Sequence, residues 1–295
     1  MRFHITHLTH YRYTDPASES YMEARLAAPS NVSQTVVRRA LAITPATRVT
    51  SYRDYYGNTV EQFSIIHRHP ELVLRVETEV DTHPVIVPGE AFDITIAEAR
   101  QIYRGQLLAR YDYLRPSAGV QLGRSVFEQA NRIFRPAGHW GDAVHELLHW
   151  VHGYFKYEPG VTSVTTTVDE ALELRRGVCQ DFAHVMIAIL RSAEIPARYV
   201  CGYIETDNQR NAAASGERHL VGAAESHAWV EIGLPNGDWY ALDPTNDIPT
   251  GERHVMISAG RDFHDVSPTR GVFKGAGRTM LSVGVIMQRQ IGTPV

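Results

Sequence analysis

Cys179 is one of two cysteines in the chain, and its sequence context favours a chemical role. Gly177 ends the preceding segment, and Cys179 stands three residues before Phe182. From there apolar residues recur at the spacing of one helical face, at Phe182, Val185, Met186, Ile189 and Leu190. Free backbone N–H groups and the helix dipole at the start of such a helix favour a thiolate over a thiol. The pattern predicts a nucleophile, and a buried structural cysteine is the alternative.

A histidine and an aspartate follow on a predicted β-hairpin. His227 lies near the start of one alternating stretch, and Asp243 ends the next. A turn centred near Pro235 would place the two directly opposite each other, within reach of a hydrogen bond. A turn centred at Asn236-Gly237 would break that pairing. The hairpin therefore predicts a His227–Asp243 pair only for the first register.

These three residue types suit acyl transfer. The imidazole of His227 would take the thiol proton of Cys179 and later give it to the leaving group, while Asp243 holds the tautomer and orientation of the ring. A lone strand histidine is more often a packed core residue. The conjunction of all three, in this order along the chain, favours a catalytic triad. Cys201 lies inside a predicted strand, away from any helix start, and is interpreted as packing.

The blocks of sequence around these residues resemble those of the transglutaminase-like superfamily. They are 177–184 (GVCQDFAH), 195–203 (IPARYVCGY), 227–231 (HAWVE) and 239–245 (WYALDPT). The resemblance covers about residues 140–247 in the expected order. It implies a papain-like fold, in which a helix bearing the cysteine packs on an antiparallel sheet bearing the other two. Carried over by position, the nucleophile is Cys179, the base His227 and the orienting acid Asp243.

Other residues within these blocks are expected to support the site. They are Gln180, Asp181 and Trp229. The oxyanion hole should include the backbone N–H of Cys179 at the helix start. Asp181 could tie that start to a neighbouring loop.

The resemblance leaves the reaction open. Members of the superfamily include glutamine–amine crosslinkers, peptidases, amidases and acyltransferases, which share a thioester intermediate and differ in whether water or an amine attacks it. We expect a peptide, protein or peptide-like amide as substrate and no cofactor, since the chain has no acidic loop typical of a calcium site. A non-catalytic binding protein on the same fold is an alternative of a different class.

A rival site is the zinc pattern H-E-x-x-H at His145, Glu146 and His149. At face value it predicts a zinc metallohydrolase. However, both histidines, and His152 with them, project on the flank of a predicted helix away from its apolar stripe, where side chains are solvated. The third ligand of the extended motif is also missing, because His152 falls at the wrong offset.

The elements around these motifs predict an α+β protein in two parts. Residues 1–100 alternate like short strands and form a β-sandwich-like module, and residues 101–295 form the transglutaminase-like domain with its motif core at 140–247. The elements expected in the second part are helices at 126–134, 140–155, 168–176 and from 179, and strands at 197–204, 226–232, 238–243 and 279–290. Residues 206–224 should be a surface loop that, with the loop at 162–166, selects the substrate. Arg261, Asp262 and Asp265 could line the cleft or only anchor a loop.

Composition excludes some partners. The 29 Lys+Arg against 33 Asp+Glu give a net charge of −4, with neither sign concentrated in a run, so nucleic acid and membrane are not expected partners. No stretch approaches the ~18 apolar residues of a membrane span, and the amino terminus lacks the apolar centre of a signal peptide. We expect a cytoplasmic protein whose two thiols stay reduced.

Overall fold

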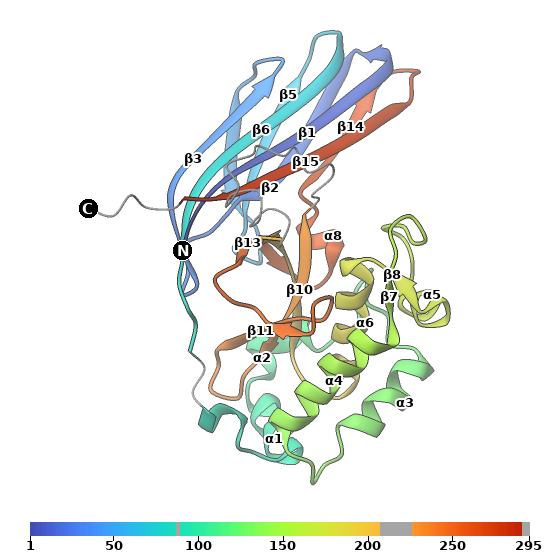
Figure 1. Cartoon of the computed structure of the whole chain (residues 1–295). Coiled ribbons are helices and arrows are strands. Elements are labelled where there is room, and N and C mark those ends of the chain that lie inside the picture. The colour runs from blue at the N-terminus through green and yellow to red at the C-terminus, as the bar shows by residue number, and fades with distance from the viewer. Residues whose placement is uncertain (87–88, 207–225, 291–295) are drawn as a thin grey trace, which may run out of the picture.

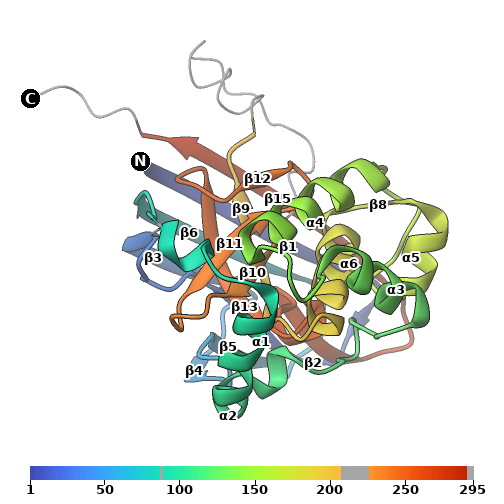
Figure 2. The same ribbon diagram turned by 90° about the horizontal axis from the view of Figure 1, so that it is seen from below.

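The computed structural model describes residues 1–86, 89–206 and 226–290, and these form an α+β fold (Figures 1 and 2). Two four-stranded antiparallel sheets lie at the top of Figure 1, and a region of helices around a five-stranded sheet lies below them. This confirms the predicted fold class, a β-sandwich-like module followed by a helix-and-sheet domain. The surface loop expected at 206–224 lies almost wholly outside the described residues.

The sandwich has the strand orders β15-β1-β6-β3 and β14-β2-β5-β4. Apolar side chains from both sheets meet between them, because alternate residues of each strand point inward. The strands are β1 Arg2–Ala17, β2 Glu19–Ala27, β3 Gln34–Thr44, β4 Val49–Arg53, β5 Thr59–Ile65, β6 His69–Thr82, β14 Thr269–Lys274 and β15 Thr279–Arg289.

The outer strands β14 and β15 come from the end of the chain. β15 pairs with β1 and β14 pairs with β2, both antiparallel. The expectation from sequence groups the whole of 101–295 with the catalytic domain, whereas the pairing places these last two strands in the sheets of the N-terminal module. Alternation identifies a strand but not its partner, since pairing joins residues far apart in the chain.

One face of the long strands contributes to two cores. Phe3 and Ile5, in the first half of β1, belong to the core of the helix-and-sheet region, and Tyr13, further along the same face, lies in the sandwich interior. In β6, Val80 belongs to the first of these cores and Leu74 belongs to the sandwich interior. The module is therefore joined to the helix-and-sheet region by continuous apolar packing.

The helix-and-sheet region has a sheet of order β12-β11-β10-β9-β13. Its strands are β9 Ala197–Ile204, β10 His227–Gly233, β11 Trp239–Asp243, β12 Ile248–Pro249 and β13 His254–Gly260, and a short parallel pair is formed by β7 Lys156–Tyr157 and β8 Arg176–Gly177. The helices are η1 Gly89–Phe92, α1 Ile96–Gly105, α2 Leu107–Arg110, η2 Tyr111–Tyr113, α3 Arg124–Ile133, α4 Trp140–Tyr154, α5 Val168–Leu174, α6 Cys179–Ser192 and α8 Phe263–Val266. None of the helices described is long and apolar enough to cross a membrane.

Helix α6 is the centre of this region. It contacts β9 and β10 on one side and α3, α4 and α5 on the others (Figure 2). The sequence predicts one buried stripe, but every residue from Gln180 to Arg191 is buried. The polar side chains of α6 can be buried because they are hydrogen-bonded. Arg191, for example, donates to the carbonyls of Arg115 and Ala197. The position of Cys179 is therefore fixed by packing on all sides of its helix.

Candidate active site

Cys179 is the first residue of α6, and Val178 is its N-cap. The thiol is partly exposed, whereas the rest of the first turn is buried. Gly177 is required just before it, because a Cβ there would lie 2.4 Å from a carboxylate oxygen of Asp181. The predicted helix start is confirmed, and it presents the sulfur at the positive end of the helix dipole.

Asp181 fixes the backbone at this helix start. Its Oδ2 accepts hydrogen bonds from the backbone N–H of Val178 at 2.8 Å and from the hydroxyl of Thr162 at 2.7 Å. Burial raises the pKa of Asp181, and these two donors oppose that shift. The structure thus places Asp181 as the tie between the helix start and the loop at 162–166. Gln180 is buried beside Cys179.

The β10–β11 hairpin differs from the predicted register. Paired residues, such as Val230 with Leu242, are centred on Asn236, so the same register places Trp229 opposite Asp243. The prediction that His227 sits directly across from Asp243 is wrong. The two are diagonal neighbours on one face of the sheet, and an imidazole and a carboxylate are long enough to span a diagonal.

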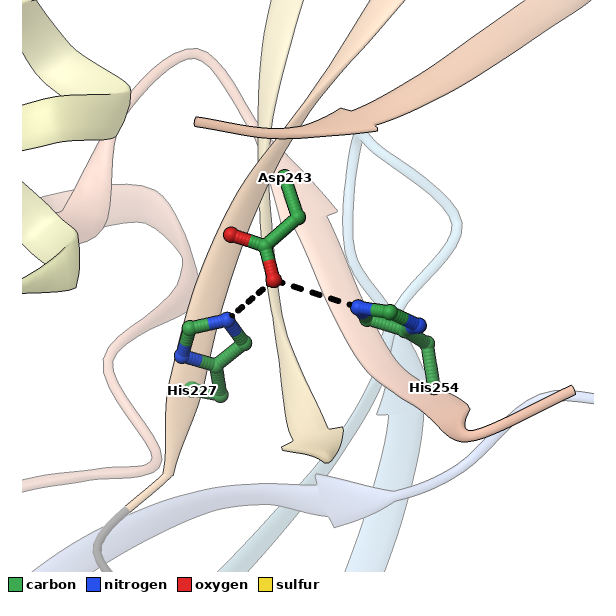
Figure 3. Close-up of side chains that lie close together, drawn as sticks. All are labelled: His227, Asp243 and His254. Atoms are coloured by element: carbon green, nitrogen blue, oxygen red, sulfur yellow. Dashed lines mark hydrogen bonds and ion pairs between the residues drawn. The ribbon is translucent and has the colours of Figure 1, made fainter. Parts of the chain in front are cut away.

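His227 and Asp243 nevertheless form the expected pair. The Nε2 of His227 lies 2.8 Å from Oδ2 of Asp243, and the histidine side chain is 10% exposed (Figure 3). Burial lowers the pKa of His227, but hydrogen bonds to Asp243 and Cys179 outweigh burial and raise the pKa to about 10. The imidazole therefore connects the thiol to the carboxylate, and it is cationic at neutral pH.

Asp243 is fully buried and receives donors from several segments. Its Oδ1 accepts from the backbone N–H of Thr245 at 3.0 Å, and its Oδ2 accepts from the Asn246 amide at 2.6 Å. Burial raises the pKa of Asp243, but hydrogen bonds from His227, His254 and Asn246 outweigh it and hold the pKa well below its ordinary range. The carboxylate stays charged next to the imidazolium.

His254 and Asn246 are site residues that the sequence analysis missed. His254 Nε2 lies 3.2 Å from Oδ2 of Asp243, and its side chain is 4% exposed (Figure 3). Asn246 carries a local signal, since an aspartate followed by polar residues forms an Asx-type turn. His254 carries none, because it reaches Asp243 only through the pairing of β9 with both β10 and β13.

Trp229 packs between the two histidines. Its ring centroid lies 6.2 Å from that of His227 and 5.4 Å from that of His254. Gly202 on β9 makes room for it, because a Cβ there would lie 2.2 Å from the indole. The indole therefore covers one side of the His227–Asp243 pair, and the supporting role expected for Trp229 stays a prediction.

The histidines of the H-E-x-x-H pattern, and His152 with them, contact the segment from Tyr240 to Asp247. His149, although its side chain is 66% exposed, places Nδ1 2.6 Å from the carboxylate of Asp247, and His152 Nδ1 lies 3.0 Å from the carbonyl of Thr245. His145 lies 3.4 Å from the hydroxyl of Tyr240. His149 and His152 are exposed, as expected for a solvated flank, while His145 is half-buried; all three histidines also contact the segment around Asp243.

Among the described residues, one group of three or more His, Cys, Asp or Glu side chains brings its ligand atoms within 4.8 Å of one another: His227, Asp243 and His254. The group does not include His145 or His149. Within it, the backbone N–H of Gly251 donates to Nδ1 of His254, so the ring proton is on Nε2, the atom facing Asp243. A protonated nitrogen donates a hydrogen bond and cannot bind a metal, so the geometry fits a hydrogen-bonded cluster.

The remaining predicted residues are structural. Cys201 is 2% exposed, and burial raises its pKa to about 12. Arg261 binds the Asp265 carboxylate at 2.8 Å, and Asp262 accepts from the backbone N–H of Gly119 at 2.7 Å. Arg261, Asp262 and Asp265 were expected either to line the cleft or to anchor a loop, and these contacts are those of a loop anchor.

Comparison with known proteins agrees with this architecture. The Transglutaminase-like superfamily pattern matches residues 128–244, and the Bacterial transglutaminase-like N-terminal region matches residues 3–81. The chain belongs to the transglutaminase-like superfamily. The matched core contains Cys179, His227 and Asp243, but it ends before His254.

Similar proteins match this superfamily member over different shares of its length. An uncharacterized protein of Mycobacterium leprae is 34% identical over 98% of this chain and 99% of its own. A protein-glutamine gamma-glutamyltransferase of Pseudomonas aeruginosa is 36% identical over 35% of this chain and 15% of its own. A candidate cysteine protease from Cytophaga hutchinsonii shares the fold at a TM-score of 0.76 and 21% identity, covering 100% of this chain and 93% of that one.

Proposed function

We propose that this protein is a cysteine-dependent acyl-transfer enzyme that cleaves an amide of a peptide or peptide-like substrate. The observation that carries the proposal is the contact of a partly exposed cysteine at a helix start with an imidazole, which in turn contacts a buried carboxylate. A binding protein without catalysis would have no need of a buried ion pair next to a thiol, because such a pair is costly to bury.

The first half of the reaction acylates Cys179. The imidazolium of His227 stabilises the thiolate, whose sulfur attacks the amide carbonyl carbon. The carbonyl oxygen becomes an oxyanion, which the backbone N–H of Cys179 is placed to stabilise. The C–N bond then breaks, and the imidazolium proton of His227 passes to the departing amine, which leaves a thioester and a neutral imidazole.

The second half releases the acyl group. Neutral His227 takes a proton from the incoming water or amine as that nucleophile attacks the thioester. The C–S bond breaks, Cys179 leaves as a thiolate, and His227 is again an imidazolium. Asp243 keeps the ring oriented through both halves and stays ionised, as its low pKa requires.

The test is capture of the acyl-enzyme. The protein is incubated with a pool of glutamine-containing peptides, quenched in acid and analysed by mass spectrometry of its tryptic peptides. We expect a mass increment on the peptide that contains Cys179, and none in Cys179→Ala. Cys201→Ala is the matched control and should keep the increment.

The same experiment identifies the acceptor. Turnover in H₂¹⁸O labels a released acid, and an added primary amine gives an amide product instead. A wild-type protein that forms no adduct and turns over no amide of the pool, under conditions in which it is folded, would contradict the proposed function.

A further inference from the structure

The N-terminal sandwich covers the free edge of the catalytic sheet. β13 is the last strand of that sheet, and the end of the sandwich lies against it in Figure 1. An uncovered edge strand leaves backbone N–H and C=O groups unpaired. Here those groups are paired by two amide side chains of the module, Gln34 and Asn58.

Each amide makes a two-point contact with one residue of β13. Gln34 accepts from the N–H of Met256 at 2.8 Å and donates to its carbonyl at 2.9 Å. Asn58 accepts from the N–H of Ala259 at 2.9 Å and donates to its carbonyl at 2.8 Å. Each side chain thus makes the pair of hydrogen bonds that a neighbouring strand would make.

The spacing of these contacts follows from a bulge. In a regular strand, the outward-facing residues are separated by an even number, whereas Met256 and Ala259 are three apart. The register of β13 against β9 shifts between Met256 and Ser258, which accounts for the extra residue. Gln34 is 0% exposed and Asn58 is 7% exposed, so both are buried polar groups whose hydrogen bonds are costly to lose.

The strand held in this way begins at His254, two residues before Met256. His254 has its tautomer set by the Gly251 N–H at 3.2 Å, so its Nε2–H points at Asp243. A continuous series of contacts therefore runs from Gln34, through β13 and His254, to the carboxylate that orients His227.

We propose that His254 is a positioning residue for the Asp243–His227 pair, and that the N-terminal module holds it in place through Gln34 and Asn58. The proposal rests on the proposed function, since it assigns a task within that triad. Oδ2 of Asp243 is shared by His227, Asn246 and His254, so the third donor sets where the oxygen sits relative to the imidazole. Without it the imidazolium is less well held beside Cys179.

The test of His254 compares two replacements of similar size. His254→Leu removes the donor, and His254→Gln retains an N–H near the position of Nε2. The readouts are the iodoacetamide rate of Cys179 against pH, followed by mass spectrometry, and the kcat and KM for an amide substrate found as above. We expect the leucine variant to lose about tenfold in alkylation rate at pH 6 and in kcat, as for one charge-assisted hydrogen bond, with KM unchanged. The glutamine variant should recover most of that loss.

The matched control is His69→Leu, which removes another buried histidine. His69 lies in the sandwich and bonds Ser20 at 2.8 Å, away from the site. We expect it to lower thermal stability without changing the pH profile of Cys179. If both His254 variants match the wild-type pH profile and kcat, the positioning role is overturned. A wild-type Cys179 that reacts no faster than Cys201 would overturn the proposed function itself, and the positioning role with it.

The contribution of the module is tested by Gln34→Ala and Asn58→Ala. Gln62→Ala is the matched control, because Gln62 is an amide of the same sandwich that bonds Glu23 and not β13. We expect Gln34→Ala to lower the alkylation rate of Cys179 at pH 6 by about threefold, which is part of the loss expected for His254→Leu. Asn58→Ala should lower that rate less, because its partner Ala259 is farther from His254 along β13 than Met256 is. Gln34→Ala and Gln62→Ala profiles that coincide would overturn the role of the module.

Discussion

The helix that carries Cys179 and the strands that carry Asp243 differ in where their contacts come from. At the start of α6, the residues that fix the sulfur are neighbours in sequence: Gly177, Val178 and Asp181. Asp243 instead depends on His227 and His254, which come from the strands β10 and β13. Tertiary packing places the helix as a whole, but the backbone around Cys179 at its start is shaped by local contacts, whereas Asp243 is held by residues from separate strands of the sheet.

This difference predicts how each part fails. A substitution at the start of α6 affects only the thiol of Cys179 and the Asp181 cap. A substitution in any strand around Asp243 affects the imidazole of His227, because several donors share Oδ2 of Asp243. The sheet side should therefore show coupling between distant substitutions, and the helix side should not.

The largest effect is expected at the two cysteines. Cys179→Ala removes the nucleophile and should lower kcat for an amide substrate by at least about 10⁴-fold. Cys201→Ala only removes a buried sulfur and should leave kcat within about twofold, at a cost in thermal stability. Circular dichroism checks that both variants fold. Comparable losses of kcat in the two would contradict the assignment of the nucleophile.

Loss of the acid comes next. Asp243→Ala leaves the imidazole unoriented and unpaired, and should lower kcat about 10³-fold. Asn246→Ala removes one of several donors to that carboxylate and should cost about tenfold or less. A double variant, Asn246→Ala with His254→Leu, should lose more than the product of the single losses, because both act on Oδ2. Independent, multiplicative losses would show that the sheet side is not coupled.

The same contrast separates what sequence could and could not predict. The start of α6 and the strands of the hairpin follow from local spacing, and the structure confirms them. The direct His227–Asp243 register was wrong because Pro235 and Asn236 are equally plausible turn centres until the strands pair. His254 and the strands β14 and β15 reach their partners over long sequence separations, for which a single sequence gives no pattern.

Thiol reactivity should differ between the cysteines by about 100-fold at pH 7, measured as iodoacetamide rates by mass spectrometry. The raised pKa of His227, about 10, keeps a positive charge beside Cys179 at every pH below that value. Because that cation favours the thiolate form of the neighbouring sulfur, Cys179 should be alkylated faster than Cys201 at pH 6, 7 and 8 alike. The rate of Cys201, with its pKa near 12, should remain low throughout. In 8 M urea the two rates should converge; equal rates for the two cysteines in the folded protein would contradict the activation of Cys179 by His227.

The smallest effect is expected at the cap of α6. Thr162→Val removes a donor to the buried Asp181 carboxylate and should lower the free energy of unfolding by about 1 kcal/mol in urea titrations at pH 7. Burial raises the pKa of Asp181, so the folded state favours the protonated acid, and the charged form costs stability as pH rises through that range. Because Thr162 donates to the charged form, the deficit of the variant should shrink as the pH falls toward 4.

Thr165→Val, in the same loop but exposed, is the control and should show no such pH dependence. If the Thr162→Val deficit were constant with pH, the hydroxyl would stabilise the loop itself and not the helix start, and the local character of the nucleophile side would have to be reconsidered.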